Sequence, residues 1–269
     1  MAIYQLPTGS YETRAVFAVQ GGSFSDKRQF TATAVLVRHP AGDLLIDAGF
    51  GAGVAAHVGA LPRFERAPYR ATRTVREQLD ASGYDRRRLL GVLLTHAHWD
   101  HVSGLDSLDV PVLMNAGELE YATGQAGGKV FRAVSADHTI QEYAVDGSPY
   151  LGFPASLDFH GDGSVVIALA GGHTTGSVVV FVTLPSSQRY AFIGDLTWQL
   201  DGIRERTERP WLMRKLADVD APVLREGLLR VIALADRMQV VPAHDCAAYA
   251  GIPELPARFA PATPAEQPR

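Results

Sequence analysis

The stretch that most constrains this chain is "LLTHAHWDHVSG", residues 93–104, which places three histidines and an aspartate within six positions. It overlaps the end of the apolar run "LLGVLL". Imidazole and carboxylate groups are costly to bury unless each of them finds a partner. If the apolar run is a buried strand, the polar cluster lies where that strand emerges into a loop. So dense a cluster there predicts a functional site.

The spacing inside this cluster suits metal binding. His96 and His98 are two positions apart, so both side chains project to the same side of an extended segment. Asp100 and His101 follow as the chain turns. These donors can face two neighbouring metal positions, but a tight cation site needs about four ligands. Further donors must therefore come from elsewhere in the chain.

Four other predicted strands each end in a histidine or an aspartate. These residues are Asp47 in "LLIDAGFG", His173 in "ALAGGHTTGS", Asp195 in "AFIGDLTW" and His244 in "QVVPAHD". The glycines before His173 let the backbone turn close to a site. Because each donor stands at the carboxyl end of a strand, we expect these side chains to converge with the first cluster.

The pattern of apolar runs predicts a layered α/β fold. Short runs rich in β-branched residues end in Gly, Pro, Asp or His, which is typical of strands. Helical periodicity covers about 72–82, 116–122 and 222–238, and a hairpin turn is expected at Pro185–Ser187. Because strands outnumber helices and the helices are spread along the chain, layers of sheet and helix are favoured over an all-β sandwich.

Domain boundaries follow from composition. With no Ser- or Gly-rich linker between two halves, residues 1–255 are expected to form one domain. The Pro/Ala-rich tail, 256–269, is expected to be loosely ordered. Two segments, about 57–69 and 201–216, fit neither strand nor helix. Such segments are often functional loops or lids, and dimer contacts are an equal alternative, so a homodimer stays open.

Composition excludes several classes of function. The net charge of −4 and the pI near 6.1 give no basic field for nucleic acid. The arginine-rich stretch Arg63–Arg76 is interpreted as a solvated helix face. The chain lacks a signal-peptide pattern and any apolar run of ~18 residues. We therefore expect a soluble, cytoplasmic protein without a membrane partner.

Other titratable residues have plainer interpretations. Cys246 is the only cysteine, which excludes a zinc–thiolate cluster, and it is expected to be a small buried side chain. Asp245 either orients a metal ligand or caps the following helix. The remaining histidines are interpreted as ordinary surface residues; they are His39, His57, His138 and His160.

Taken in order, the five motifs resemble those of the metallo-β-lactamase-fold hydrolases. The resemblance spans residues 47–244, from the Asp47 turn through the His-x-His-x-Asp-His segment to His244. It implies a four-layer αββα sandwich, with a dinuclear metal site at the edge where strands of both sheets end.

The resemblance also implies a role for each donor. His96, His98 and His173 would hold the first metal; Asp100, His101 and His244 would hold the second. Asp195 would bridge the two metals, and Asp47 would orient a ligand through a hydrogen bond. Two divalent ions sharing a water would supply hydroxide at neutral pH, with Asp100 and Asp195 as the catalytic carboxylates. Zinc suits these ligands, as do manganese, iron and cobalt.

Among these hydrolases, the chain is similar to N-acyl-homoserine lactonases and related lactone or ester hydrolases. Asp195 argues against a true β-lactamase, which typically lacks the bridging carboxylate. The 25 residues after His244 are too few for a glyoxalase-type extension. The expected substrate is a small lactone or carboxylic ester. Phosphodiester or thioester hydrolysis, a mononuclear iron persulfide dioxygenase, and a binding protein without catalysis remain alternatives.

One position departs from the lactonase pattern. Trp198 stands where lactonases commonly carry a tyrosine that helps to hold the substrate carbonyl, so the group that stabilises this oxygen stays open. All three tryptophans lie near the predicted site in sequence. Trp99, Trp198, Trp211 and Met213 are candidates for an apolar substrate pocket, with core packing as the alternative.

Overall fold

The strands form two sheets that pack face to face. The computed structural model describes residues 1–63, 65–124 and 128–259. In the first sheet the order is β4 (Tyr69–Ala71), β1 (Ala2–Arg14), β2 (Lys27–Arg38), β3 (Asp43–Ile46), β5 (Leu89–Leu93), β6 (Val112–Asn115) and β7 (Ile140–Tyr143). In the second it is β12 (Gln239–Val241), β11 (Arg189–Phe192), β10 (Val178–Thr183), β9 (Val165–Leu169) and β8 (Ser156–Asp158).

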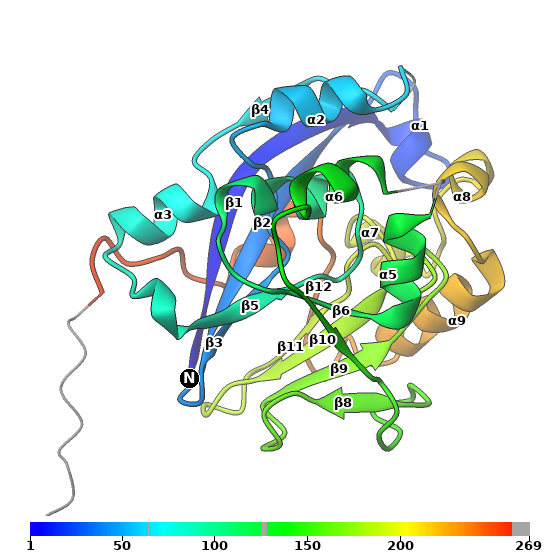
Figure 1. Cartoon of the computed structure of the whole chain (residues 1–269). Helices are drawn as coiled ribbons and strands as arrows, with labels where there is room; N and C mark the ends of the chain where they lie inside the picture. Colours follow the sequence, from blue (N-terminus) through cyan, green and yellow to red (C-terminus); the bar gives the residue numbers. More distant parts are fainter. Residues whose placement is uncertain (64, 125–127, 260–269) are drawn as a thin grey trace, which may run out of the picture.

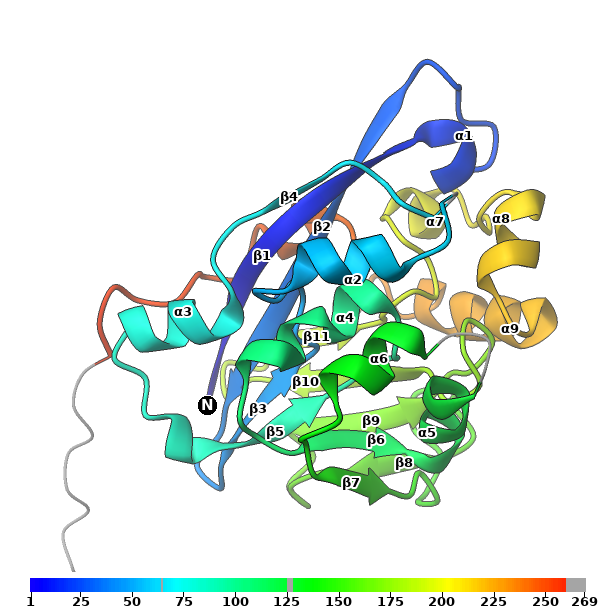
Figure 2. The same ribbon diagram turned by 45° about the horizontal axis from the view of Figure 1, so that its top comes forward.

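Helices cover the outer faces of the two sheets (Figures 1 and 2). They are α1 (Ala15–Ala18), α2 (Val54–Ala60), α3 (Val75–Ala81), α4 (Trp99–Val102), α5 (Ala116–Thr123), α6 (Lys129–Val134), α7 (Asp201–Arg204), α8 (Trp211–Ala217) and α9 (Ala221–Ile232). The described residues also form short 3₁₀ turns at Arg86–Arg88, Ser103–Ser107 and Cys246–Tyr249.

Alternation along the strands produces the layers. In β2, Ala34 and Leu36 belong to the core between the first sheet and its helices, whereas Val35 and Val37 belong to the core between the sheets. Successive side chains of a strand point to opposite faces, so an unbroken apolar run buries both faces at once.

The second sheet repeats this arrangement. Val178 and Val180 of β10 face the first sheet, while Val179 and Phe181 pack into a third core that includes Leu228 of α9. Three buried cores therefore separate four layers. The predicted αββα sandwich is confirmed.

The predicted helices are present with shifted ends. The helix expected at 222–238 is α9, which ends at Ile232, and the one expected at 72–82 is α3, which begins after a capping box formed by Thr74 and Glu77. The hairpin turn at Pro185–Ser187 is confirmed between β10 and β11, where the Leu184 N–H donates to the Gln188 carbonyl.

The two segments expected to be irregular contain regular structure. Residues 57–69 include the end of α2 and the start of β4, and residues 201–216 include α7 and most of α8. These elements have three to seven residues. Short elements whose apolar residues follow no clear period are not recognised from sequence.

Three expectations from composition are wrong. The stretch Arg63–Arg76 is not a helix face, because only its last two residues belong to α3 and its other described residues form loop and β4. Cys246 is exposed, at the start of a 3₁₀ turn that Asp245 caps through the N–H of Ala247. His39 is buried, stacked on His160 and hydrogen-bonded to Asp162 at 2.9 Å.

The chain end differs from its expectation over the residues that can be described. The Phe259 N–H donates to the Ser82 carbonyl at 2.8 Å, and its ring contacts Tyr4 and Tyr84. The chain at 256–259 therefore lies against the first sheet, while 260–269 fall outside the described residues.

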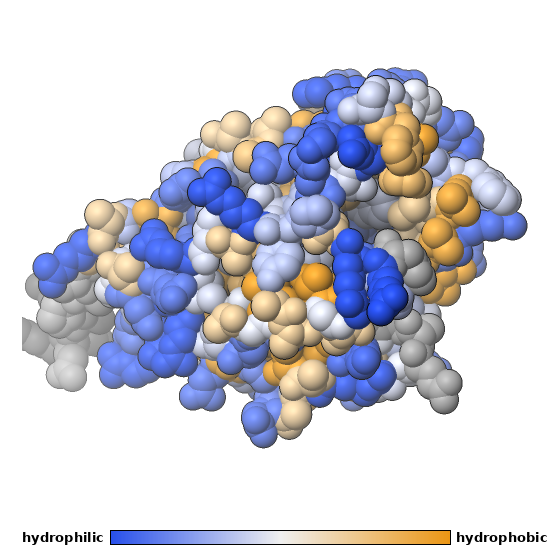
Figure 3. Space-filling model, turned by 90° about the horizontal axis from the view of Figure 1, so that it is seen from above, coloured by the Kyte–Doolittle hydropathy of each residue, from blue (hydrophilic) through white to orange (hydrophobic). Residues whose placement is uncertain are grey.

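One group of exposed apolar side chains lies near α1 and α8. Seen from above, they lie over α1 and α8 (Figure 3), where Phe24, Trp211, Leu212 and Leu216 are exposed. In the described part of the chain, no helix has both the length and the apolar character needed to cross a membrane.

Candidate metal centre

The predicted donors all stand just beyond the carboxyl ends of strands. Asp47 follows β3, His96 and His98 follow β5, and Asp100 and His101 form the first turn of α4. His173, Asp195 and His244 follow β9, β11 and β12. Within each sheet these strands run in the same direction. Their carboxyl ends therefore meet at one edge of the sandwich, where ligands usually bind in α/β folds.

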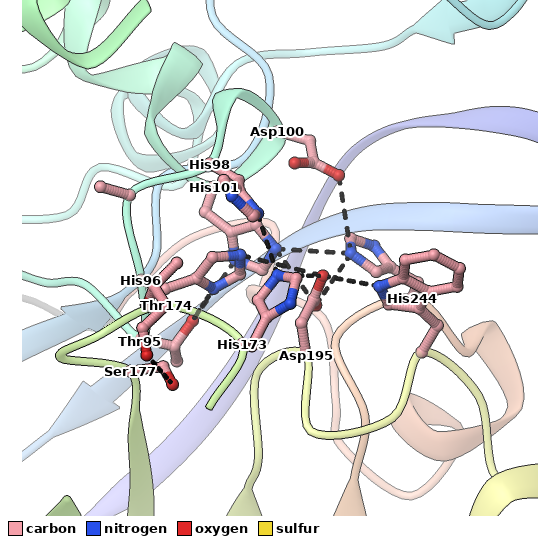
Figure 4. Close-up of polar contacts among 12 residues, drawn as sticks. Thr95, His96, His98, Asp100, His101, His173, Thr174, Ser177, Asp195 and His244 are labelled. Atoms are coloured by element: carbon pink, nitrogen blue, oxygen red, sulfur yellow. Dashed lines mark hydrogen bonds and ion pairs between the residues drawn. The ribbon is translucent and has the colours of Figure 1, made fainter. Parts of the chain in front are cut away.

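The structure brings the seven predicted ligand side chains together in two groups (Figure 4). One group contains His96, His98, His173 and Asp195, and the other contains Asp100, His101 and His244. Within each group, one donor atom from every residue lies within 4.8 Å of the others. All seven residues except His98 are buried.

Asp195 lies between the groups, with one carboxylate oxygen toward each. Its Oδ2 lies 3.3 Å from His173 Nε2 and 3.8 Å from His96 Nε2. Its Oδ1 lies 3.0 Å from His244 Nε2 and 3.5 Å from His101 Nε2. This is the placement that a carboxylate bridging two cations requires.

The outer nitrogen of each histidine has its own partner. His101 Nδ1 pairs with Asp47 at 2.8 Å, His173 Nδ1 with Asp218 at 2.9 Å, His244 Nδ1 with the Thr31 carbonyl at 2.9 Å, His98 Nε2 with Tyr121 Oη at 2.9 Å and His96 Nδ1 with Thr95 Oγ1 at 3.2 Å. A carbonyl only accepts, so His244 donates from Nδ1, and a neutral His244 keeps its lone pair on Nε2. The other four contacts allow the same arrangement.

Five imidazole lone pairs and two carboxylates therefore converge on one volume. Among the described residues, neither His96 Nε2 nor Asp195 Oδ1 has a hydrogen-bond partner. Buried polar atoms without partners are rare in native proteins and indicate a missing ion or water. Imidazole and carboxylate are also the ligands that Zn²⁺ and similar divalent ions take. The residues fit a pair of divalent cations.

Electrostatics divides the histidines into two kinds. Burial lowers the pKa of His96 and His98 well below the usual value, so both are neutral at pH 7. Burial also acts to lower the pKa of His101 and His244. The carboxylate of Asp47 beside His101, and that of Asp195 beside His244, outweigh it and raise the pKa of both histidines above the usual value. Burial acts to raise the pKa of Asp195, but the nearby His244 and His96 outweigh this effect and hold the pKa well below its usual range.

Asp47 occupies the position expected of an orienting residue. Besides His101 it accepts from the backbone N–H of Thr95 at 2.7 Å and from its hydroxyl at 2.9 Å. Its backbone is left-handed, with φ of 57°, a conformation that non-glycine residues hold only where the surroundings enforce it. Asp47 thus links the end of β3 to the segment that carries His96.

Glu118 on α5 was not anticipated from the sequence. Its carboxylate is buried and accepts from the N–H of Ala97 at 2.6 Å, the Thr174 hydroxyl at 2.6 Å and the N–H of Gly176 at 3.1 Å. It therefore ties the His96–His98 segment to the His173 loop. Burial raises the pKa of Glu118. Its one sequence signal, a Glu three residues after Asn115, suggests only a helix start.

Two tyrosines were also missed. Tyr11 of β1 donates to Asp100 Oδ2 at 2.7 Å, and Tyr121 of α5 contacts His98 as described above. Burial raises the pKa of Tyr11 well above its usual value and that of Tyr121 to about 12, so both phenols keep their protons at pH 7. Their sequence contexts carry no motif, because the contacts form only when distant elements pack.

A cleft of about 1050 Å³ opens onto the two groups. His98, Asp100, His173 and Asp195 lie on its floor. Of the aromatic and Met candidates, Trp99, Trp198 and Met213 line it. Trp211 is not among the described lining residues and is 60% exposed. The Trp198 indole donates to Asp195 Oδ2 at 2.8 Å, so this N–H is already engaged.

Comparisons with known proteins agree with this geometry. The family model of the metallo-beta-lactamase superfamily matches residues 28–244. A probable metallo-hydrolase of Mycobacterium tuberculosis and one of Mycobacterium bovis are each 27% identical over 236 residues, which covers 78% of this chain and 73% of theirs.

Solved structures share the fold at low identity. An N-acyl homoserine lactone hydrolase, with the product N-hexanoyl-L-homoserine at its catalytic metal centre, superposes with a TM-score of 0.72 at 15% identity, over 94% of this chain and 98% of its own. AidC, a dizinc quorum-quenching lactonase, gives 0.62 at 14% identity, over 91% of this chain and 87% of its own.

Proposed function

The chain belongs to the metallo-beta-lactamase superfamily and is a metal-dependent hydrolase, and we propose that it cleaves a lactone or carboxylic ester at a dinuclear centre. The observation that carries this proposal is the position of Asp195, with one oxygen toward each of two ligand groups. We assign the hydrolase domain to residues 1–255, which include the family match.

The proposed ligands follow from the two groups. His96, His98 and His173 would hold one cation, Asp100, His101 and His244 the other, and Asp195 both, with zinc as the first candidate. Bound divalent cations lower the pKa of water and polarise a carbonyl oxygen. The fixed outer hydrogen bonds of the imidazoles keep their inner lone pairs aimed at the centre before any substrate arrives.

Asp100 is the proposed proton carrier. It lines the cleft, and its Oδ2 accepts from Tyr11, which leaves its second oxygen free to take a proton and return it to a leaving alcohol. Trp198 does not replace the lactonase tyrosine in this scheme, because its indole N–H is used by Asp195. Its ring, with Phe30 and Met213, supplies an apolar wall for the substrate.

The test combines elemental analysis with a substrate panel. Purified protein is expected to hold two divalent ions per chain and to hydrolyse lactones and aryl esters faster than thioesters and phosphodiesters. His98→Ala and Asp195→Ala are expected to lose both metal and turnover, whereas His160→Ala, a histidine remote from the centre, keeps both. Turnover of phosphodiesters alone, or one iron per chain with oxygen consumption, contradicts the proposal.

A further inference from the structure

α8 is a short helix with an exposed body and buried flanking residues. Its side chains Trp211 and Leu216 are 60% and 59% exposed, and none of its seven residues is buried. By contrast, Arg209, just before the helix, is 3% exposed, and the side chain of Asp218, directly after it, is fully buried. Arginine and aspartate are almost never fully buried unless they are paired.

These two buried charges pair with each other across the ends of α8. Arg209 Nη1 donates to Asp218 Oδ1, and Nη2 donates to the main-chain oxygen of Asp195. The guanidinium lies over the Trp198 ring, 4.4 Å from its centroid. The ion pair thus closes a loop around α8 and holds the helix at both ends, in addition to the ion pair of Arg214 in the helix with Glu208.

The same ion pair reaches a proposed metal ligand. His173 Nδ1 donates to Asp218 Oδ1 at 2.9 Å, and Arg209 Nη1 lies 3.0 Å from that nitrogen. Because Asp218 accepts this proton, Nε2 is the unprotonated nitrogen that faces Asp195. A carboxylate in this position fixes both the tautomer and the orientation of a metal-binding imidazole. Arg209 balances the charge that Asp218 would otherwise carry alone in the interior.

Main-chain hydrogen bonds reinforce the connection. The N–H of Val219 donates to the His173 carbonyl at 3.2 Å, and that of Asp220 donates to the Gly172 carbonyl at 2.8 Å. The segment after α8 is therefore attached to the His173 loop through both side chain and backbone.

From this geometry we propose that Arg209 and Asp218 are positioning residues that fasten α8 to His173. One buried ion pair then holds both the metal-binding imidazole and the apolar wall that Leu212, Met213 and Leu216 of α8 give to the cleft. The inference rests on the proposed function, since His173 is one of its ligands.

Metal affinity tests the first part of the proposal, that the ion pair positions His173. Removing one charge alone would leave the other buried without a partner. The main variant is therefore Arg209→Met/Asp218→Asn, which removes both charges and keeps an amide oxygen as the acceptor for His173. Competition against a chromophoric chelator, without substrate, is expected to show binding weakened about 10- to 100-fold. Arg209→Lys keeps the charge and is expected to bind closer to the wild type than Arg209→Met.

Trypsin tests the half that concerns α8. The helix contains Arg214 and Lys215, two trypsin cleavage sites that can be followed in metal-free protein without substrate. Cleavage at these sites, followed by mass spectrometry, is expected to be severalfold faster in the double variant. Arg237→Met, which removes an exposed arginine beyond the end of α9, is the control and is expected to match the wild type in both measurements.

A kinetic comparison separates positioning from a general loss of structure. Loosening α8 is expected to raise KM for an aryl octanoate more than for the acetate of the same alcohol, while the lost orientation of His173 lowers kcat for both. Wild-type metal affinity in the double variant would overturn the role assigned to His173, and wild-type trypsin cleavage would overturn the fastening of α8.

The outcomes of the chelator and trypsin measurements do not depend on the identity of the substrate. A wild-type protein that hydrolyses no lactone or ester defeats the proposed function and leaves the chelator and trypsin comparisons decisive. A wild-type protein that binds no divalent metal overturns the role of His173, and cleavage of α8 still decides the rest.

Discussion

At the scale of single residues, the predicted donors were visible in the sequence, whereas the side chains that hold them were not. The donors are histidines and aspartates at strand ends, a chemical type at a recognisable position. Their partners include Glu118 on α5, Tyr11 on the distant strand β1, Arg209 in the segment 201–216 that was expected to be irregular, and Asp218 just after that segment. No spacing rule connects such residues, because the contacts arise from tertiary packing.

Glu118 gives a prediction at this scale. Glu118→Gln replaces one acceptor oxygen by an amide that faces an N–H or hydroxyl donor, so a buried donor loses its partner, at a cost of about 1–3 kcal/mol. Urea unfolding is expected to show this loss, together with weaker metal binding. Glu120→Gln, on the exposed side of the same helix, is the matched control. Equal stability of the two variants would show that Glu118 does not join the two loops.

Tyr11 gives a second prediction at the scale of single residues. Tyr11→Phe removes the hydrogen bond to Asp100 and leaves the ring packed against Phe30 and Trp99. The second metal is expected to bind about 10-fold more weakly, because ligands lose affinity when the groups orienting them are removed. Stepwise chelator titration measures this. Tyr69→Phe, which keeps its edge contact with Phe50, should behave as the wild type; the same loss there would implicate the aromatic cluster instead of Asp100.

At the scale of elements, segments with a clear apolar pattern were predictable and segments without one were not. Successive side chains of the strands point into two different cores, and this continuous apolar composition identifies the strands in the sequence. α2 and α7 bury only two residues each and α8 buries none, so no amphipathic pattern marked them. What holds α8 is an ion pair outside the helix, which a periodicity argument cannot detect.

The start of α3 can be tested as an element. The Thr74 side chain accepts from the N–H of Glu77, and the Glu77 carboxylate accepts from the N–H of Thr74. Thr74→Ala is expected to lower the free energy of unfolding by about 0.5–2 kcal/mol, the usual loss for an N-cap. The urea midpoint should fall with an unchanged slope. Thr72→Ala, on the exposed residue two positions earlier, is expected to cost less.

At the scale of the whole molecule, the two sheets also meet far from the proposed metal centre. His39, after β2, stacks on His160, before β9, with ring centroids 3.8 Å apart and planes 14° apart. Asp162, Asp158 and Asp43 are the other charged groups that face His160. Burial, and then the neighbouring His39, lower the pKa of His160 in the folded protein.

This contact predicts how stability depends on pH. Since the folded pKa of His160 lies below its unfolded value of about 6.5, protonation favours the unfolded chain. The contribution is complete above that value and is lost as the pH falls below it. Urea unfolding of the wild type and of His160→Phe, between about pH 5 and 7.5, should show a steeper acid loss in the wild type. Parallel curves would exclude His160 as a source of that loss.

The position of His244 sets an order on how the molecule is made. His96, His98, His173 and Asp195 have all been synthesised once the chain reaches residue 195, but the other group needs His244, whose ring is held by Thr31 near the opposite end of the chain. Nearly the whole polypeptide must therefore leave the ribosome before both proposed cation sites have all their ligands. Any fragment cut short before that histidine is expected to be inert, however well the rest of it folds.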